Sequence, residues 1–237
     1  MDNIQRLLAL QNEDSLHRAL QNELKVLLPK RRAEAKARLQ AARDAVEAAV
    51  QENEAAARTY NRFQDDYNRH RDQMRRAERN ATGLTNARAL EAAQREHANA
   101  AAEANRAAAE ADRAGSYVTP TERKLDEARA FEAQEEAAVQ EIYDAIDARK
   151  VDVEAKAAEA KTRCEAAATE VPADLLAYYT RLKLTRWPCV VEYDRKRNVC
   201  PGCNLIQPQS VTQAVLSAER RGAAGTVHCP SCGRILI

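Results

Sequence analysis

A seven-residue repeat runs through residues 39–77, which read LQAARDAVEAAVQENEAAARTYNRFQDDYNRHRDQMRRA. One position of the repeat carries mostly large side chains, and the position three residues later carries mostly small ones. These two sets are Leu39, Val46, Asn53, Tyr60, Tyr67 and Met74, and Ala42, Ala49, Ala56, Phe63, His70 and Ala77. A repeat sustained in this way predicts the seam of a coiled coil, in which a polar residue such as Asn53 fixes the register.

Two interruptions are expected downstream of this seam. Residues 80–83 read Asn-Ala-Thr-Gly, which predicts a turn near 80–85. A second break is expected near 115–120, followed by a new helix with Thr119 as its cap and Pro120 at its first helical position. A returning apolar seam comprises Leu125, Val139, Ile142, Ile146, Val153 and Ala160.

A helix, a turn and a return of similar length predict an antiparallel hairpin. Net charge favours this pairing, because residues 1–80 carry +3 and residues 121–170 carry −6. The same heptads could instead form a parallel coiled coil between two copies of the chain. The two breaks argue against this alternative, because they would interrupt a continuous parallel coiled coil. We expect a mainly α protein, with a long antiparallel coiled-coil hairpin over residues 1–170 and a kink rather than a stop at Pro29.

Composition excludes several other classes. The chain has 237 residues, of which 31% are charged, 4% are aromatic and only six are glycine, so an extended β or α/β fold has too few turn residues. No apolar run is long enough to cross a membrane, and no basic start precedes an apolar stretch. We therefore expect a cytoplasmic protein with no membrane partner.

Four of the six cysteines form two Cys-x-x-Cys pairs, Cys200 with Cys203 and Cys229 with Cys232. They lie in residues 171–237, which we expect to form a linker helix and a small C-terminal β zinc ribbon. Two such turns can hold one Zn²⁺ in a tetrahedron with Zn–S distances of about 2.3 Å. Because all four positions are filled by cysteine, the ion should be structural, stabilising the module by on the order of 10 kcal/mol.

Other interpretations of the cysteines are weaker. A disulfide within Cys-x-x-Cys is strained, and a thioredoxin-like site would need a βαβ unit that the sequence does not predict. We expect Cys164 and Cys189 to be buried as small hydrophobic residues, and His228 to lie beside the metal site without binding the ion.

The two cysteine segments, Cys200-Pro-Gly-Cys-Asn-Leu-Ile-Gln-Pro-Gln and Cys229-Pro-Ser-Cys-Gly-Arg-Ile-Leu-Ile, resemble a bacterial C4-type zinc ribbon family. Its members carry a coiled-coil hairpin before the ribbon, and its opening motif resembles Leu7, Leu10-Gln11 and Asp14 of this chain. The resemblance implies a non-enzymatic adaptor for a protein partner, such as the alternative sigma factor sigma-54 or a component of flagellar or type III secretion systems. Some members are suspected of binding nucleic acid.

The leading hypothesis is a protein-binding scaffold in which the hairpin gives reach and the ribbon docks the partner. The alternative is an RNA- or DNA-binding protein that uses basic residues, although these residues also fit an ordinary solvated surface. The candidates are Arg195, Lys196, Arg197, Arg220, Arg221 and Arg234 near the ribbon, and Arg71, Arg75 and Arg76 near the hairpin turn. No phosphate loop or hydrolase motif occurs, so we expect no enzyme and no small-molecule substrate.

Overall fold

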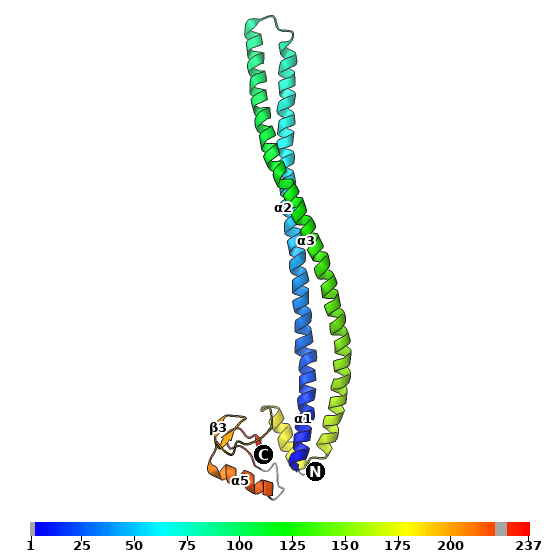
Figure 1. Cartoon of the computed structure of the whole chain (residues 1–237), viewed down its shortest axis with the longest axis vertical. Helices are drawn as coiled ribbons and strands as arrows, with labels where there is room; N and C mark the ends of the chain where they lie inside the picture. The colour runs from blue at the N-terminus through cyan, green and yellow to red at the C-terminus, as the bar shows by residue number, and fades with distance from the viewer. Residues whose placement is uncertain (1–2, 221–226) are drawn as a thin grey trace. The chain divides into compact units, whose positions relative to one another are not determined.

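The computed structural model describes residues 3–220 and 227–237, and its helices and strands are shown in Figure 1. It confirms a mainly α fold with a long antiparallel helical hairpin and small strands near the cysteines. The helices are α1 (Asn3–Asn22), the π-helix η1 (Glu23–Leu27), α2 (Leu28–Ala81), α3 (Ala87–Thr169), α4 (Ala173–Lys183) and α5 (Gln209–Arg220). The strands are β1 (Val190–Val191), β2 (Val199–Cys200), β3 (Leu205–Ile206) and β4 (Ile235–Leu236).

Contacts divide the chain into two compact units. We call Arg32–Asp144 the hairpin unit, and Met1–Arg31 together with Ala145–Ile237 the ribbon unit. The sequence predicts a division between residues 170 and 171, into a coiled-coil hairpin and a linker helix with a ribbon, and this division stays a prediction.

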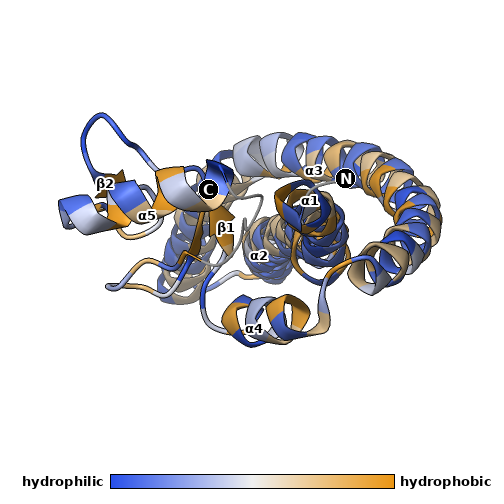
Figure 2. Cartoon of the chain, turned by 90° about the horizontal axis from the view of Figure 1, so that it is seen from below, coloured by the Kyte–Doolittle hydropathy of each residue, from blue (hydrophilic) through white to orange (hydrophobic). Residues whose placement is uncertain are grey.

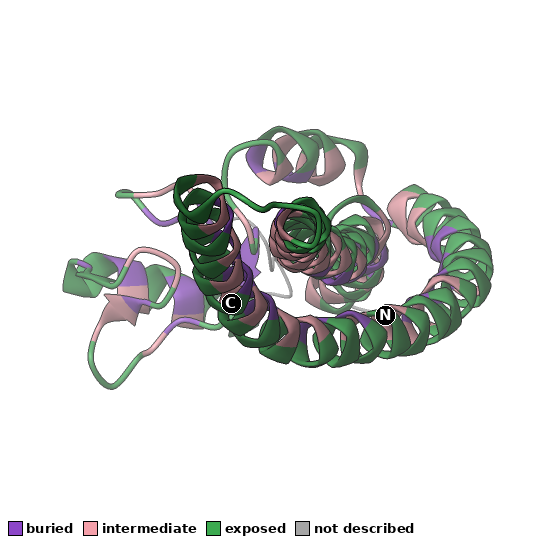
Figure 3. Ribbon diagram, turned by 90° about the horizontal axis from the view of Figure 1, so that it is seen from above, coloured by how far each residue is buried: buried purple, intermediate pink, exposed green. Residues whose placement is uncertain are grey.

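Alanine lines much of the interface of the hairpin unit. The α2 residues of the predicted seam are all buried or half-buried, which confirms the heptad assignment. Figure 3 shows exposed residues over most of α3, with the buried ones confined to a narrow stripe. Small side chains in this stripe let the two backbones approach closely, so van der Waals contact replaces a thick apolar core. The buried alanines are Ala35, Ala42, Ala49, Ala77, Ala93, Ala100, Ala104, Ala107, Ala111 and Ala114.

The turn of the hairpin lies where the sequence predicts it. Helix α2 ends at Ala81 and α3 begins at Ala87. The side chain of Asn86 caps α3, because its Oδ1 accepts a hydrogen bond of 3.0 Å from the backbone N–H of Arg88. This bond satisfies one of the N–H groups that have no partner at a helix start.

The predicted break near 115–120 is wrong, because α3 continues through Pro120 without interruption. Gly115 provides space rather than a turn. A Cβ atom at this position would lie 3.3 Å from the Tyr60 ring, so glycine allows α2 and α3 to pack closely there. Pro120 is exposed, so its ring points away from the packed interface of the hairpin.

The hydroxyl of Thr121, the residue after Pro120, lies between its own helix and the other arm of the hairpin. It lies 2.8 Å from the carbonyl oxygen of Val118 and 2.9 Å from Oδ1 of Asn53 on the other arm. Asn53 is therefore paired across the hairpin, as expected for a polar residue that fixes the register.

Ion pairs between the arms of the hairpin unit follow the predicted charge asymmetry in part. Arg38 lies 2.8 Å from the carboxylate of Glu135, and Arg43 lies 3.1 Å from that of Glu136. Lys124 on α3 instead pairs with Glu52 on α2, with the signs reversed. Glu135 is half-buried and the other partners are exposed, so solvent screens most of these pairs and each contributes about 1 kcal/mol or less to stability.

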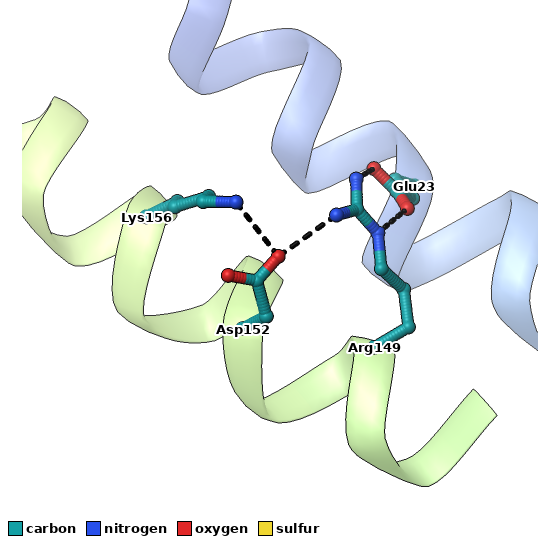
Figure 4. A network of polar contacts seen from close by, with 4 residues as sticks. All are labelled: Glu23, Arg149, Asp152 and Lys156. Carbon is teal, nitrogen blue, oxygen red and sulfur yellow. Dashed lines mark hydrogen bonds and ion pairs between the residues drawn. The ribbon is translucent and has the colours of Figure 1, made fainter. Parts of the chain in front are cut away.

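In the ribbon unit, charged residues join η1 to α3 next to the irregular turn before Pro29 (Figure 4). Arg149 donates two hydrogen bonds to the carboxylate of Glu23, at 2.7 and 3.1 Å, and a third to Asp152 at 2.8 Å. The hydrogen bond from Arg149 lowers the pKa of Glu23. The helix continues past Pro29, as predicted.

The main core of the ribbon unit joins segments from both ends of the chain. Figure 2 shows α1, α4 and β1 side by side, each carrying hydrophobic residues. Strand β1 pairs in parallel with β4, and β2 pairs with β3 in antiparallel. The buried residues of this core are Leu7, Leu10, Val171, Tyr179, Leu182, Cys189, Val190 and Ile235.

Two buried polar residues of α1 tie it to this core. The side chain of Gln11 pairs with the backbone of β1 and of the residue before it. Its Oε1 accepts hydrogen bonds from the N–H groups of Cys189 (2.8 Å) and Val190 (2.7 Å). Its Nε2 donates a hydrogen bond to the Val190 carbonyl (2.9 Å). Asp14, which is 2% exposed, accepts hydrogen bonds from the Tyr179 hydroxyl and from Lys183. These contacts give both polar residues of α1 a structural role in the core.

We expect Gln11→Ala to lower the free energy of unfolding of the ribbon unit by about 2–3 kcal/mol, because it leaves buried backbone groups of Cys189 and Val190 unpaired. Hydrogen exchange of these two amides should accelerate. The control is Asn12→Ala at an exposed neighbouring position, which should change stability by less than about 0.5 kcal/mol. Unchanged protection of both amides in Gln11→Ala would contradict the role assigned to this side chain.

Candidate metal centre

The four cysteines of the two Cys-x-x-Cys pairs converge in the ribbon unit. Their Sγ atoms all lie within 4.8 Å of one another. The Sγ atoms of Cys200 and Cys232 are 3.8 Å apart, and those of Cys203 and Cys229 are 3.9 Å apart. A tetrahedron with Zn–S bonds of about 2.3 Å has S–S edges of about 3.8 Å, whereas a disulfide needs about 2.0 Å. The donor set and its spacing therefore fit a four-coordinate zinc ion.

The backbone forms the same turn after each Cys-x-x-Cys pair. In the first turn, the N–H of Asn204 donates to the Cys200 carbonyl at 2.7 Å; in the second, the N–H of Gly233 donates to the Cys229 carbonyl at 2.8 Å. Asn204 and Gly233 both adopt the left-handed conformation, with φ of 58° and 76°. Asn and Gly are the residues that tolerate this conformation best, which explains their position directly after the second cysteine.

Arg234 does not lie on the basic surface that the sequence predicts. It is 8% exposed, and its guanidinium donates hydrogen bonds to the carbonyls of Pro188 (2.8 Å) and Trp187 (3.2 Å). A Cβ atom at Gly202 would lie 2.2 Å from Cδ of Arg234, so glycine is required for this close approach. The assignment of Arg234 to a nucleic-acid contact is wrong; it supports the cysteine turns from inside the module.

Burial makes the metal-free cluster hard to ionise. It raises the pKa of Cys200 to about 12 and also raises that of Cys203 above its ordinary value of 9.0. Burial is also the largest single influence on Cys232, but hydrogen bonds from the backbone and side chain of Arg234, together with those from Cys229 and Cys200, outweigh it and lower the pKa of Cys232 to about 7. Because four adjacent thiolates repel one another, a divalent cation is what allows all of them to ionise.

The remaining cysteines and His228 lie outside the cluster. Cys189 is fully buried in the main core, and Cys164 is half-buried on α3. Burial raises the pKa of each thiol to about 11, so both behave as small apolar residues. The His228 ring lies 4.1 Å from the Tyr178 ring, and burial lowers its pKa. His228 is not among the four residues whose ligand atoms converge.

The basic residues near the ribbon do not all gather on one surface. Arg195 pairs with Glu219 at 3.0 Å, and the exposed Lys196 and Arg197 donate backbone N–H bonds to Asp194. The other candidates of this group are Arg220, which is exposed at the end of α5, and Arg221, which lies outside the described residues.

The basic candidates near the hairpin turn belong to α2 in the hairpin unit. Arg75 and Arg76 are exposed, whereas the guanidinium of Arg71 lies 5.5 Å from the centre of the Tyr67 ring.

Helix α5, between the two cysteine pairs, was missed by the sequence interpretation. Its signal is present, because Val211, Val215 and Ala218 follow helical spacing and are all buried. Gln207 was missed as well: it is 3% exposed, and its Nε2 donates to the Leu205 carbonyl at 2.9 Å and lies 3.3 Å from Oγ of Ser231. It therefore links the two cysteine turns.

Within residues 3–220 and 227–237, no helix is both long and apolar enough to cross a lipid bilayer.

Comparisons identify proteins with the same fold. No family model matches the chain, and no curated protein does. The solved structure of CT398 from Chlamydia trachomatis has a TM-score of 0.75 at 19% identity, covering 99% of this chain and 96% of that one. HP0958 from Helicobacter pylori has a TM-score of 0.61 at 15% identity, with the same coverage of both chains. A protein from Mycobacterium smegmatis has a TM-score of 0.57 at 19% identity, covering 100% and 99%. At these identities the likeness shows the fold alone.

Cobalt provides a spectroscopic test of the metal centre. We expect one Co²⁺ per chain to give the intense thiolate-to-metal absorption of a tetrahedral four-sulfur site. Cys200→Ser should weaken binding and change this spectrum. The matched control is Cys189→Ser, a buried cysteine outside the cluster, which should keep the stoichiometry and the spectrum. Equal spectra for both variants would contradict the assigned ligands.

Zinc binding should release protons. At about pH 7.5 the thiols of Cys200 and Cys203 are protonated, because the pKa of each lies above 9.0. Their coordination as thiolates must expel these protons, so the apparent zinc affinity should fall as the pH falls. Calorimetry in two buffers of different ionisation enthalpy measures the release, and a binding heat independent of the buffer would argue against thiolate ligation.

Proposed function

We propose that the chain is a non-enzymatic zinc-binding adaptor whose ribbon unit docks a protein partner. The four-thiol cluster is the observation that carries this proposal. Cys200, Cys203, Cys229 and Cys232 fill every position of a tetrahedral shell, so a bound Zn²⁺ keeps none open for water or a substrate. Such an ion stabilises a small module rather than catalysing a reaction. A small stable module that is joined to a long hairpin can serve as the binding surface for a protein partner.

The sequence resemblance supports the choice of partner. We propose that the chain belongs to the bacterial C4-type zinc ribbon family with a coiled-coil hairpin. Its partner would then be sigma-54 or a component of a flagellar or type III secretion system. We place the adaptor in the cytoplasm, where a reducing environment keeps zinc-binding thiols from forming disulfides.

Affinity capture tests the adaptor function. The zinc-loaded protein should recover a defined protein partner from cells of its source, as identified by mass spectrometry. Cys200→Ser, which removes a ligand, should recover much less of it, whereas Cys189→Ser should recover as much as the unaltered chain. Recovery of no protein, or of nucleic acid alone, would overturn the proposal.

Nucleic-acid binding is the second candidate, and unpaired arginines on α2 favour it. Among the described residues, no ion pair is recorded for Arg62, Arg75, Arg76 or Arg79, whereas Arg38 on the same helix pairs with Glu135. Unpaired guanidinium groups on one helix attract phosphates.

A salt titration of RNA and DNA binding tests this candidate. Arg75→Gln combined with Arg76→Gln should weaken binding and reduce its salt dependence. The slope of the logarithm of the binding constant against the logarithm of the salt concentration should fall in magnitude by about 0.9 for each duplex phosphate that the variant no longer neutralises. Arg38→Gln is the control with its own ion partner and should leave the slope unchanged. Equal slopes for both variants would exclude phosphate binding on this part of α2.

A further inference from the structure

Arg234 carries a buried positive charge in the ribbon unit. It is 8% exposed, and its guanidinium donates hydrogen bonds to two neutral groups, the carbonyls of Pro188 and Trp187. Arg195 and Arg197 of the same module each lie within 4 Å of a carboxylate, whereas no ion pair of Arg234 is recorded in the described part of the chain. A buried charge is costly unless an opposite charge lies nearby. The position of Arg234 therefore requires an anion other than a carboxylate.

The metal centre supplies this anion. Arg234 follows Cys232 by two residues, and its side chain also hydrogen-bonds to that cysteine. The same side chain crosses the first cysteine turn, because a Cβ atom at Gly202 would lie 2.2 Å from its Cδ, 2.6 Å from its Nε and 2.9 Å from its Cζ. A Zn²⁺ ion bound by four thiolates keeps a net negative charge. The guanidinium therefore lies where it can offset that charge, in contact with both turns.

The glycine at position 202 is explained by this contact. Among the described glycines only Gly233 has a positive φ, so the backbone at Gly202 would accept a side chain. The three atoms nearest to a Cβ placed there all belong to Arg234. A larger residue at 202 would therefore displace the guanidinium before it disturbed the turn itself.

The same guanidinium joins the metal centre to the main core of the ribbon unit. Its Nε donates to the Pro188 carbonyl at 2.8 Å, and its Nη2 donates to the Trp187 carbonyl at 3.2 Å. Trp187 packs against the main core, and the guanidinium of Arg18 on α1 lies 4.3 Å from the centre of its ring. A single side chain therefore links the first cysteine turn, through Trp187, to α1.

We propose that Arg234 is a positioning residue of the metal centre with two roles. Its charge offsets that of the four thiolates and strengthens zinc binding, and its fork of N–H groups fixes the Trp187–Pro188 segment against the metal-bound turns. Zinc occupancy is thereby transmitted to the main core, which includes α1. This inference rests on the proposed zinc-binding function and deepens it, because it names the residue through which the metal controls the rest of the ribbon unit.

The zinc affinity of the full chain, measured by competition with a chelator, tests the role of the charge. Arg234→Met keeps an unbranched side chain, removes the charge and should weaken zinc binding about 10- to 100-fold. Arg234→Lys restores the charge and should recover part of this affinity. The control is Arg197→Met, which removes an exposed cation of the same module and should stay within about twofold. Cobalt spectra record whether each variant keeps the four-sulfur site.

Three results would overturn the role of the charge. The first is an Arg234→Met chain that binds zinc as tightly as the unaltered one. The second is an equal loss of affinity in Arg234→Met and Arg234→Lys, which would mean that packing alone matters. The third is an equal loss in Arg197→Met, which would mean that net charge matters and its position does not.

Gly202→Ala tests the position of the guanidinium without changing any charge. Alone it should weaken zinc binding about tenfold, because the added Cβ displaces the side chain of Arg234. In an Arg234→Ala chain the atoms that this Cβ would meet are absent, so adding Gly202→Ala should change affinity by less than about twofold. Losses that simply add would contradict the contact between these two residues as the cause.

Trp187 is the only tryptophan of the chain, so its fluorescence reports on the coupling to the main core. Adding zinc to the metal-free unaltered chain should shift its emission. At saturating zinc, this shift should be largely lost in Arg234→Met and retained in Arg197→Met. Emission of the unaltered chain that does not respond to zinc, or an equal response in Arg234→Met, would overturn the coupling.

The outcomes separate this inference from the proposed function. If the unaltered chain binds no metal, the zinc-binding function is wrong and this inference falls with it. If the unaltered chain and Arg234→Met bind zinc equally well and with the same Trp187 response, this inference alone is wrong and the zinc-binding function stands.

Discussion

The part of the ribbon unit that holds β2, β3 and α5 depends on the convergence of four thiols. Their Sγ atoms lie within 4.8 Å of one another, and the two turns that carry them are separated by α5 in the sequence. Burial opposes ionisation of Cys200 and Cys203, so the arrangement needs a cation to hold four thiolates together. The strands around the cluster are each two residues long and would not pair stably alone. The pairing of β2 with β3 therefore depends on the metal centre.

Local sequence patterns predict the hairpin and the metal ligands well. The heptad repeat depends on the spacing of residues along one helix, and the two Cys-x-x-Cys pairs form turns that are almost complete within a few residues. The turn near 80–85 is similarly local, because Asn86 caps the helix that follows it. For such features no knowledge of the distant chain is needed.

Features that depend on distant contacts were not predictable in the same way. Gly115 suggests a break by itself, but it faces Tyr60 on the other arm, and the close approach of the arms keeps α3 intact. Arg234 suggests a surface cation, yet the carbonyls of Trp187 and Pro188 hold it inside the module. In both cases the residue has the local preference that the sequence suggests, but a contact with a distant part of the chain determines its structural role.

The hydrogen bonds between Gln11 and β1 have a consequence for biosynthesis. Gln11 and its hydrogen-bond partner Val190 are 179 positions apart, and the same core includes Leu7 and Ile235. During synthesis, the apolar residues of α1 that pack against β1 and β4 stay exposed until these late residues leave the ribosome. The hairpin unit can form earlier, because its contacts lie within residues 32–144. The interval between the two events is a period when chaperones have access to α1.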